Sequence, residues 1–266
     1  ELGGAEWLQG YLNIIRQQYP GRTLLLDGGD MFQGTMISNL FEGATVVNAM
    51  NHLGYSAAAV GNHEFDFGVV GPGQVEEGKD PFGALKERGK QATFPFLTAN
   101  LVDRKTGKVV DWEGFAPYTI VQLHGVKVGI VGGPTPSTPG ASRSYVDEQL
   151  EFLPLAEVVK KYAPVMRKEG AGIIIALVHI GGKCKESGNP DDLSSCDPTE
   201  DVFQLARDLE PGTVDLIVGG HSHGVVAHRV NGTAVVEAGA KGEMFGLAKI
   251  RYLTGENRVT GVDVAR

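Results

Sequence analysis

Four short apolar runs in the sequence each lead into side chains that could bind a metal ion or a phosphate. The runs cover residues 23–26, 57–60, 173–178 and 215–218, and the side chains that follow them are Asp30, Asn62 and His63, His179, and His221 and His223. Uncharged runs of this length are typical of central strands in a parallel sheet, whose carboxyl ends meet at one edge and bind ligands there. A single histidine after a strand is usually structural. Because four runs end in the same way, the sequence predicts that these polar side chains meet in one site.

These residue types suit a pair of divalent metal ions. The carboxylate of Asp30 has two oxygens and can bridge two ions about 3.5–4 Å apart, as in two-metal hydrolases. Imidazole nitrogens and an amide oxygen, from His179, His221 and Asn62, favour zinc, manganese, iron or cobalt over calcium. His223 lies two residues after His221, so in an extended loop both side chains point to the same side and can reach one ion each. Two such ions would generate hydroxide near neutral pH and hold a phosphate for in-line attack.

His63 is the candidate donor of the proton that the leaving group requires. It follows Asn62 directly, but successive side chains of an extended segment diverge, which leaves its ring free to act as a general acid. A carboxylate that hydrogen-bonds the ring would orient it; Asp66 lies three residues further on, whereas Glu64 is expected to be structural. The remaining candidates are expected to have structural roles at a turn, on the surface or in the core: Asp27, His52, His124 and His228.

Composition describes an ordinary globular chain and excludes some functions. The 266 residues, 42% hydrophobic and 21% charged, are enough for one large α/β domain with a buried core. The net charge of -8 argues against a nucleic-acid partner, which would need a basic face. No apolar run approaches the roughly 20 residues that span a bilayer, so no membrane span is expected.

Two cysteines, Cys184 and Cys196, lie in a polar stretch of the sequence. Zinc sites built from cysteines use closer pairs and more sulfurs. A disulfide that closes the loop is therefore favoured over two free thiols. Such a bond would indicate an oxidising compartment.

The order of the expected elements describes a mixed α/β fold. Helical periodicity predicts helices at residues 8–15, 44–53, 81–88, 155–168 and 200–209, and apolar or alternating runs predict further strands at 96–99, 225–229, 234–237, 247–253 and 259–264. Residues 118–131 indicate a hairpin that turns at His124 and Gly125, and residues 68–80 an irregular surface loop. Helices separate the first strands but not the last ones, which indicates a sandwich of mixed sheets flanked by helices. No repeat or linker divides the chain, so one domain over residues 1–266 is expected.

Four motifs resemble those of the calcineurin-like metallophosphoesterases: GGDMFQG at 28–34, GNHEFDFG at 61–68, VHIGG at 178–182 and GGHSH at 219–223. They occur in the family's order and are most similar to the secreted branch that includes 5'-nucleotidase, UDP-sugar hydrolase and 2',3'-cyclic-nucleotide phosphodiesterase. The resemblance implies a four-layer αββα sandwich. It also implies a periplasmic or extracellular hydrolase of nucleotide phosphate esters that uses two divalent metal ions.

The same resemblance implies a role for each candidate residue. Asp30 would bridge the two ions, and His63 with Asp66 would form the catalytic dyad. The other ligands would divide between the ions, with Asn62, His179 and His221 on the second ion and His223 on the first.

The resemblance also sets expectations for the two ends of the chain. Family members have a first strand with an Asp-x-His-Gly block that supplies two ligands to the first ion, and this sequence would begin just after it. They also have a C-terminal domain that stacks the nucleobase between aromatic rings. Residues 1–266 would then be the catalytic domain without these two parts. Two other functions stay open, a thiosulfohydrolase of similar fold and a catalytically silent module that binds metal or nucleotide.

Overall fold

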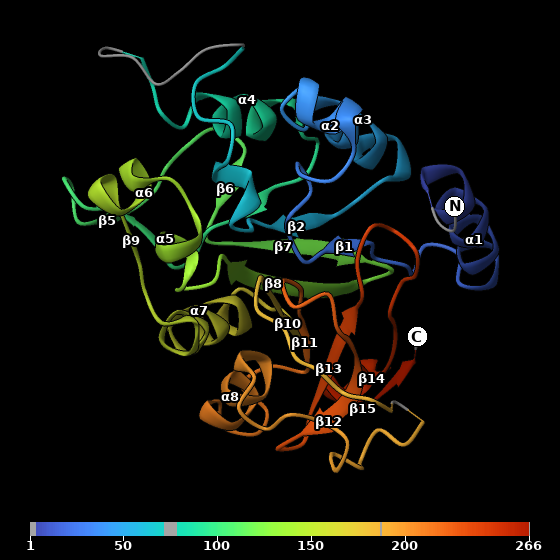
Figure 1. The fold of residues 1–266 in the computed structure, drawn as a ribbon. Helices are drawn as coiled ribbons and strands as arrows, with labels where there is room; N and C mark the ends of the chain where they lie inside the picture. The colour runs from blue at the N-terminus through green and yellow to red at the C-terminus, as the bar shows by residue number, and fades with distance from the viewer. Residues whose placement is uncertain (1–3, 72–78, 187, 266) are drawn as a thin grey trace.

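The computed structural model of the chain describes residues 4–71, 79–186 and 188–265, and it arranges them in layers of helix and sheet (Figure 1). Within the expected loop at 68–80, residues 72–78 lie outside the described part. No helix of the described residues is both long enough and apolar enough to cross a membrane.

The helices agree with the sequence pattern at most positions. Residues 44–53 and 155–168 were predicted as helices and form helices with those bounds. The first of them ends at Gly54, which takes the left-handed conformation (φ 75°) that commonly closes a helix. The α-helices are α1 (Ala5–Gln18), α2 (Met36–Leu40), α3 (Ala44–Leu53), α4 (Gly83–Gln91), α5 (Thr138–Ala141), α6 (Ser144–Gln149), α7 (Leu155–Lys168) and α8 (Asp201–Asp208), with short 3-10 helices η1 (His63–Phe65) and η2 (Thr254–Glu256).

The strands form two larger sheets and two smaller ones. A parallel sheet has the order β1-β2-β3-β6 and a mixed sheet the order β12-β13-β11-β10-β8-β7, while β5-β4-β9 and β14-β15 make the smaller sheets. The strands are β1 (Leu26–Asp27), β2 (Ala57–Ala59), β3 (Phe96–Leu97), β4 (Leu101–Asp103), β5 (Lys108–Val109), β6 (Phe115–Ala116), β7 (Tyr118–Leu123), β8 (Val126–Gly133), β9 (Leu150–Phe152), β10 (Ile173–Val178), β11 (Leu216–Val218), β12 (Val225–Val230), β13 (Thr233–Ala238), β14 (Leu247–Leu253) and β15 (Arg258–Ala265).

Several strands are shorter than predicted, and the first of them differs most. The apolar run at 23–26 was expected to be a strand, but β1 covers only Leu26 and Asp27. This strand lies at the edge of the parallel sheet and pairs with β2 alone, over two residues. Residues 23–25 therefore approach the sheet without forming a ladder, apart from the carbonyl of Leu25, which accepts a hydrogen bond from the backbone N–H of Ser56 (2.8 Å).

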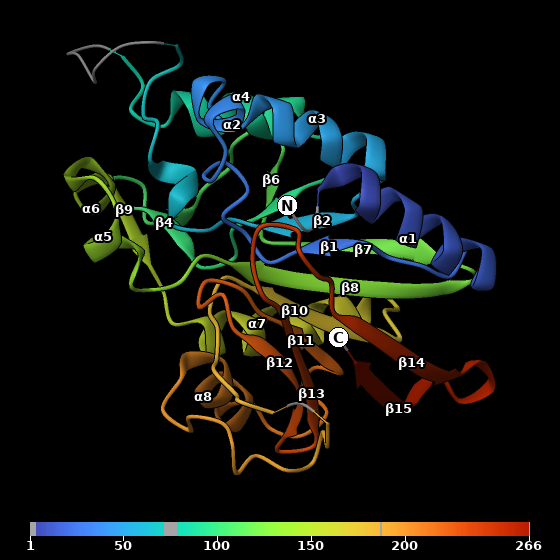
Figure 2. The ribbon, with the colours of Figure 1, turned by 45° about the vertical axis from the view of Figure 1, so that its right-hand side comes forward.

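The two larger sheets pack face to face, and helices cover their outer faces. Between the sheets lie small and β-branched side chains, among them Ala57, Ala59, Ile130 and Ile175. Helices α7 and α8 pack against the outer face of the mixed sheet, and α3 and α4 lie on the outer side of the parallel sheet (Figure 2). The predicted four-layer αββα sandwich is confirmed.

Candidate metal centre

The loops that leave four parallel strands meet at one edge of the sandwich. In the parallel sheet, β1 leads to Asp30 and β2 leads to Asn62; in the mixed sheet, β10 leads to His179 and β11 leads to His221. The loops approach one another closely, since a Cβ atom added to Gly28 would lie 2.6 Å from the carbonyl oxygen of Gly219. Close contact of the backbones thus brings together side chains that are far apart in the sequence.

The ring of His179 is the centre of the cluster. Its Nε2 atom lies 3.1 Å from Oδ2 of Asp30, 3.2 Å from Oδ1 of Asn62 and 3.2 Å from Nδ1 of His221. Its Nδ1 atom lies 2.7 Å from the carbonyl oxygen of Gly28, which can only accept a hydrogen bond. In a neutral ring the proton is therefore on Nδ1, and Nε2 presents a lone pair to the other three atoms.

The cluster has the composition and spacing of a metal-binding site. A carboxylate oxygen, an amide oxygen and two ring nitrogens converge, and potential ligand atoms of Asp30, His179 and His221 all lie within 4.8 Å of one another. Bonds of about 2.0–2.2 Å from one zinc-like ion to nitrogen and oxygen put neighbouring ligand atoms roughly 3–3.5 Å apart. A cation would satisfy the facing lone pairs, so the residues fit a divalent metal ion.

Opposite charges shift the pKa values inside the cluster. Burial acts to lower the pKa of His179, but the hydrogen bond and the negative charge of Asp30 outweigh it and raise this pKa. Burial acts to raise the pKa of Asp30, and the contact with His179 outweighs it and lowers that pKa. The pKa of His221 is lowered by burial and by the neighbouring charge of His179. A neutral His221 is the form that binds a metal ion.

His223 does not join this cluster. Its side chain is exposed, and no group of three or more potential ligands among the described His, Cys, Asp and Glu residues includes it. Both His221 and His223 have positive φ angles (75° and 56°), so the segment is not extended as the sequence argument assumed. The structure therefore brings Asp30, Asn62, His179 and His221 together and leaves His223 beside them.

His63 and Asp66 lie next to the cluster and contact each other. Nδ1 of His63 is 2.7 Å from Oδ2 of Asp66, which also accepts a hydrogen bond from the side chain of Gln33 (2.9 Å). The backbone N–H of His63 donates to Oδ1 of Asp30 (3.0 Å), so the pair is attached to the carboxylate of the cluster. Burial acts to lower the pKa of His63, but the hydrogen bond to Asp66 and the nearby carboxylates raise it. The ring is 43% exposed, which leaves Nε2 open to a substrate.

Two buried glutamates, Glu64 and Glu237, connect the loops around the cluster, and the sequence predicted a structural role for Glu64 alone. Glu64 has a structural role, as predicted: it accepts hydrogen bonds from the backbone N–H groups of Asp30, Phe32 and Gly61 (2.6–3.0 Å). Its pKa is raised to about 7 by burial and by the charge of Asp30.

Glu237, in β13, is the residue that sequence reasoning missed. It accepts hydrogen bonds from the backbone N–H of Gly182 (2.8 Å), from the hydroxyl of Ser222 (2.8 Å) and from the backbone N–H of Gly224 (3.2 Å). It thus joins the loop after His179 to the loop that carries His221. Burial raises its pKa to about 7. The one available signal was an acidic residue inside the apolar run 234–238.

The other candidates have structural positions. Asp27 accepts a hydrogen bond from the backbone N–H of Gly29 (2.9 Å) and so shapes the turn before Asp30. His124 lies at the tip of the hairpin of β7 and β8, and His52 is exposed at the end of α3. His228 is buried in β12.

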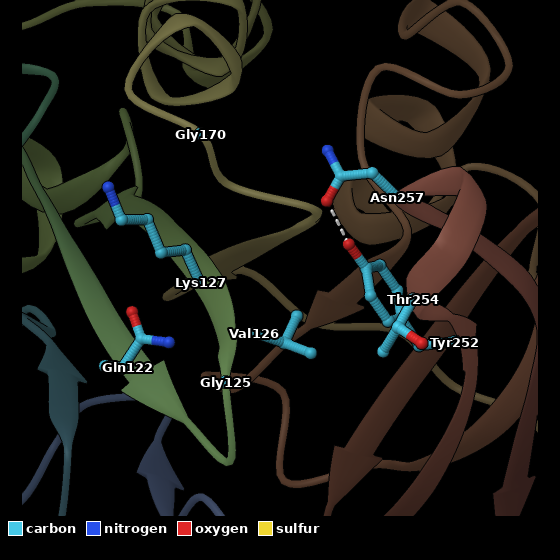
Figure 3. Close-up of a pocket in the computed structure, with 8 residues that line it drawn as sticks. All are labelled: Gln122, Gly125, Val126, Lys127, Gly170, Tyr252, Thr254 and Asn257. Carbon is cyan, nitrogen blue, oxygen red and sulfur yellow. Dashed lines mark hydrogen bonds between the residues drawn. The ribbon is translucent and has the colours of Figure 1, made fainter.

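An open pocket of about 390 Å³ lies away from this centre (Figure 3). Lys127, Gly170, Tyr252 and Asn257 are among the residues that line it, and the hydroxyl of Tyr252 donates to Oδ1 of Asn257. Lys127 is near the start of β8 and Gly170 precedes the parallel strand β10, whereas His179 follows the end of β10. The pocket is therefore at the opposite edge of the mixed sheet and is separate from the metal centre.

Known proteins resemble the chain in sequence and in fold. A 5'-nucleotidase from Vibrio parahaemolyticus is 31% identical over 264 residues, which cover 92% of this chain and 43% of the relative. The 5'-nucleotidase precursor from Thermus thermophilus has a similar structure, with a TM-score of 0.73, 27% identity and coverage of 99% of this chain and 48% of that one. The sulfate thiohydrolase SoxB from Thermus thermophilus has a TM-score of 0.74 at 20% identity over 99% of this chain and 42% of that one, which shows a shared fold alone.

The chain spans less than half the length of the curated relatives it matches. A family comparison matches the calcineurin-like phosphoesterases over residues 3–225, a range that contains every residue of the candidate metal cluster and the His63–Asp66 pair. The chain belongs to the calcineurin-like phosphoesterase family.

Proposed function

We propose that the chain is the catalytic domain of a hydrolase that cleaves phosphate esters of nucleotides, in the manner of a 5'-nucleotidase. The observation that carries the proposal is the attachment of the His63–Asp66 pair to Asp30, the same carboxylate that faces Nε2 of His179. A metal-binding cluster and a histidine with an open ring nitrogen thus lie side by side. The names of the similar proteins support the nucleotide as substrate.

Each residue has a separate task in this proposal. Asp30, Asn62, His179 and His221 would hold one divalent ion, and Asp30 and His223 would contribute to a second. When bound, such ions provide a hydroxide near neutral pH and neutralise the charge of the phosphate.

The side chain of His63 would supply the proton. As the P–O bond to the ribose breaks, Nε2 of His63 would donate a proton to the leaving oxygen. Asp66 keeps the ring in place through Nδ1 (2.7 Å) and stabilises its protonated form. The raised pKa of His63 agrees with this task, because a general acid must carry its proton near neutral pH.

Turnover of 5'-AMP and of p-nitrophenyl phosphate by the metal-loaded protein tests the proposal. The expected result is hydrolysis that requires a divalent ion and that depends on His63 but not on the exposed His52. Metal binding without hydrolysis of either compound would instead indicate a silent metal-binding module. Hydrolysis of a thiosulfate conjugate in place of both esters would identify a thiosulfohydrolase.

We also infer that the protein works in the periplasm or outside the cell. Cys184 and Cys196 form a disulfide, as predicted from the sequence, and disulfides persist mainly in oxidising compartments. Detection of the protein in the cytoplasm, with both thiols reduced, would contradict this inference.

A further inference from the structure

A second group of side chains that could bind a metal ion lies where the loop between β10 and α8 meets β12. The disulfide of Cys184 and Cys196 packs there against the outer core of the mixed sheet, and His228 of β12 faces the same region. Ligand atoms of the two cysteines and of His228 all lie within 4.8 Å of one another. None of these residues belongs to the metal centre described above.

His228 has one ring nitrogen without a partner. Its side chain is 1% exposed, and Nε2 lies 2.9 Å from the carbonyl oxygen of Glu186, so Nε2 carries the proton that is donated to that oxygen. Nδ1 of a neutral ring then has a lone pair, and it makes no hydrogen bond within the part of the chain that the structure describes. Leaving such a buried atom unpaired costs on the order of 1–3 kcal/mol. The ring is oriented through Nε2 in the way that metal-binding histidines are commonly oriented by a carbonyl group.

The backbone holds the two cysteines opposite each other independently of the sulfur–sulfur bond. Cys184 and Cys196 form an antiparallel bridge, flanked by hydrogen bonds from the N–H of Lys185 to the carbonyl of Ser195 (3.2 Å) and from the N–H of Asp197 to the carbonyl of Lys183 (2.9 Å).

The same loop is also attached to β12. The N–H of Arg229 donates to the carbonyl of Pro190 (2.7 Å), and the guanidinium of Arg229 pairs with Asp191 (2.7 Å). Because these contacts do not involve sulfur, both thiols would stay near His228 after reduction.

The geometry points to a redox-gated metal site in which Cys184, Cys196 and Nδ1 of His228 bind a thiophilic cation such as Zn²⁺ once the disulfide is reduced. In the reduction, an external dithiol is oxidised to its own disulfide. It transfers two electrons and two protons to the Cys184–Cys196 disulfide, which becomes two thiols. Metal binding then releases the two thiol protons, because the thiolate is the ligand. In the oxidised protein the sulfur atoms are bonded to each other and cannot act as thiolates, so the site is closed.

The distances suit this ion. Zinc bonds of about 2.3 Å to sulfur and 2.0–2.1 Å to nitrogen place the ligand atoms of a tetrahedral site roughly 3.4–3.8 Å apart. This spacing lies within the 4.8 Å that already encloses the three ligand atoms. The fourth position would be taken by solvent, since Cys184 and Cys196 are only partly buried.

Titration of the reduced protein with Co²⁺ tests the inference without reference to catalysis. Thiolate ligands give cobalt an intense charge-transfer absorption in the near ultraviolet, and the other metal centre has no sulfur ligand to produce it. The protein is reduced with dithiothreitol, and the reductant is then removed under argon. This reduced protein should show the absorption, and the oxidised protein should not. Absence from the reduced protein as well would overturn the inference.

Variants separate a built site from adventitious binding by two thiols. Cys184→Ser should abolish the absorption, and His228→Asn should weaken cobalt binding by at least about tenfold, since even a lost outer partner of a ligand costs that much. An exposed histidine gives the matched control, His52→Asn, which should titrate like the parent. Equal titration of His228→Asn and the parent would contradict the role of His228. If that variant fails to fold, cadmium NMR of the reduced parent tests the site instead. A signal typical of sulfur coordination is expected. A spectrum with only oxygen and nitrogen coordination would overturn the proposed site.

Discussion

Replacement of Glu237 by alanine tests whether this buried carboxylate positions the metal ligands. Glu237 accepts three hydrogen bonds, but two of the donors have other acceptors. The hydroxyl of Ser222 can donate to the carbonyl of Gly182 (2.9 Å), and the N–H of Gly224 can donate to that hydroxyl (3.2 Å). The N–H of Gly182 has no second acceptor among the described residues. One unpaired buried donor lowers the free energy of unfolding by about 1–3 kcal/mol.

The same replacement should also weaken metal binding. Among the described residues, no hydrogen bond of Glu237 goes to a candidate ligand. It joins the loop after His179 to the loop of His221, and loss of such an outer contact typically lowers metal affinity by about 10–100-fold. Competition with a coloured chelator measures this affinity, and urea unfolding of the metal-free protein measures stability. Glu243→Ala is the matched control, because Glu243 is exposed and lies six residues further along the chain. The reasoning is refuted if Glu237→Ala binds metal within twofold of the parent.

Three further predictions concern the metal centre. His63→Ala should keep its metal and lose turnover by about 10²–10⁴-fold, whereas Asp30→Ala should lose both, as metal analysis and p-nitrophenyl phosphate assays would show; equal metal loss in the two variants would mean that His63 is a ligand. Dialysed protein should retain about one tightly bound ion per chain, because Asp30 belongs to a single group of three potential ligands among the residues that the structure describes. Two equally tight ions would contradict this prediction. The metal-free protein should lose about 3 kcal/mol of stability between pH 4 and pH 8 through Glu237, whose pKa rises from 4.5 to about 7 on folding, at about 1.4 kcal/mol per unit. The stabilisation is complete below pH 4.5 and disappears as the pH rises through 7, so urea unfolding should show a steeper pH dependence for the parent than for Glu237→Gln.

The sequence by itself determined the elements and the types of ligand. The helices at 44–53 and 155–168 and the strand at 173–178 follow from local periodicity and from apolar runs, which act over a few residues. The candidate ligands were recognisable because each stands within five residues after such a run. The rule that parallel strands end at one edge was then enough to predict that Asp30, Asn62, His179 and His221 converge.

Only the tertiary structure decided how these side chains are held. The ring of His179 is fixed by the hydrogen bond that it donates to the carbonyl oxygen of Gly28, 151 residues away, and the link between the two histidine loops comes from Glu237 in another strand. His223 is exposed and takes a positive φ angle, and no sequence periodicity reveals either feature. The unpaired nitrogen of His228 next to the disulfide is likewise visible only in three dimensions. Such contacts depend on which loops pack together, and local sequence preferences carry no information about partners so distant along the chain.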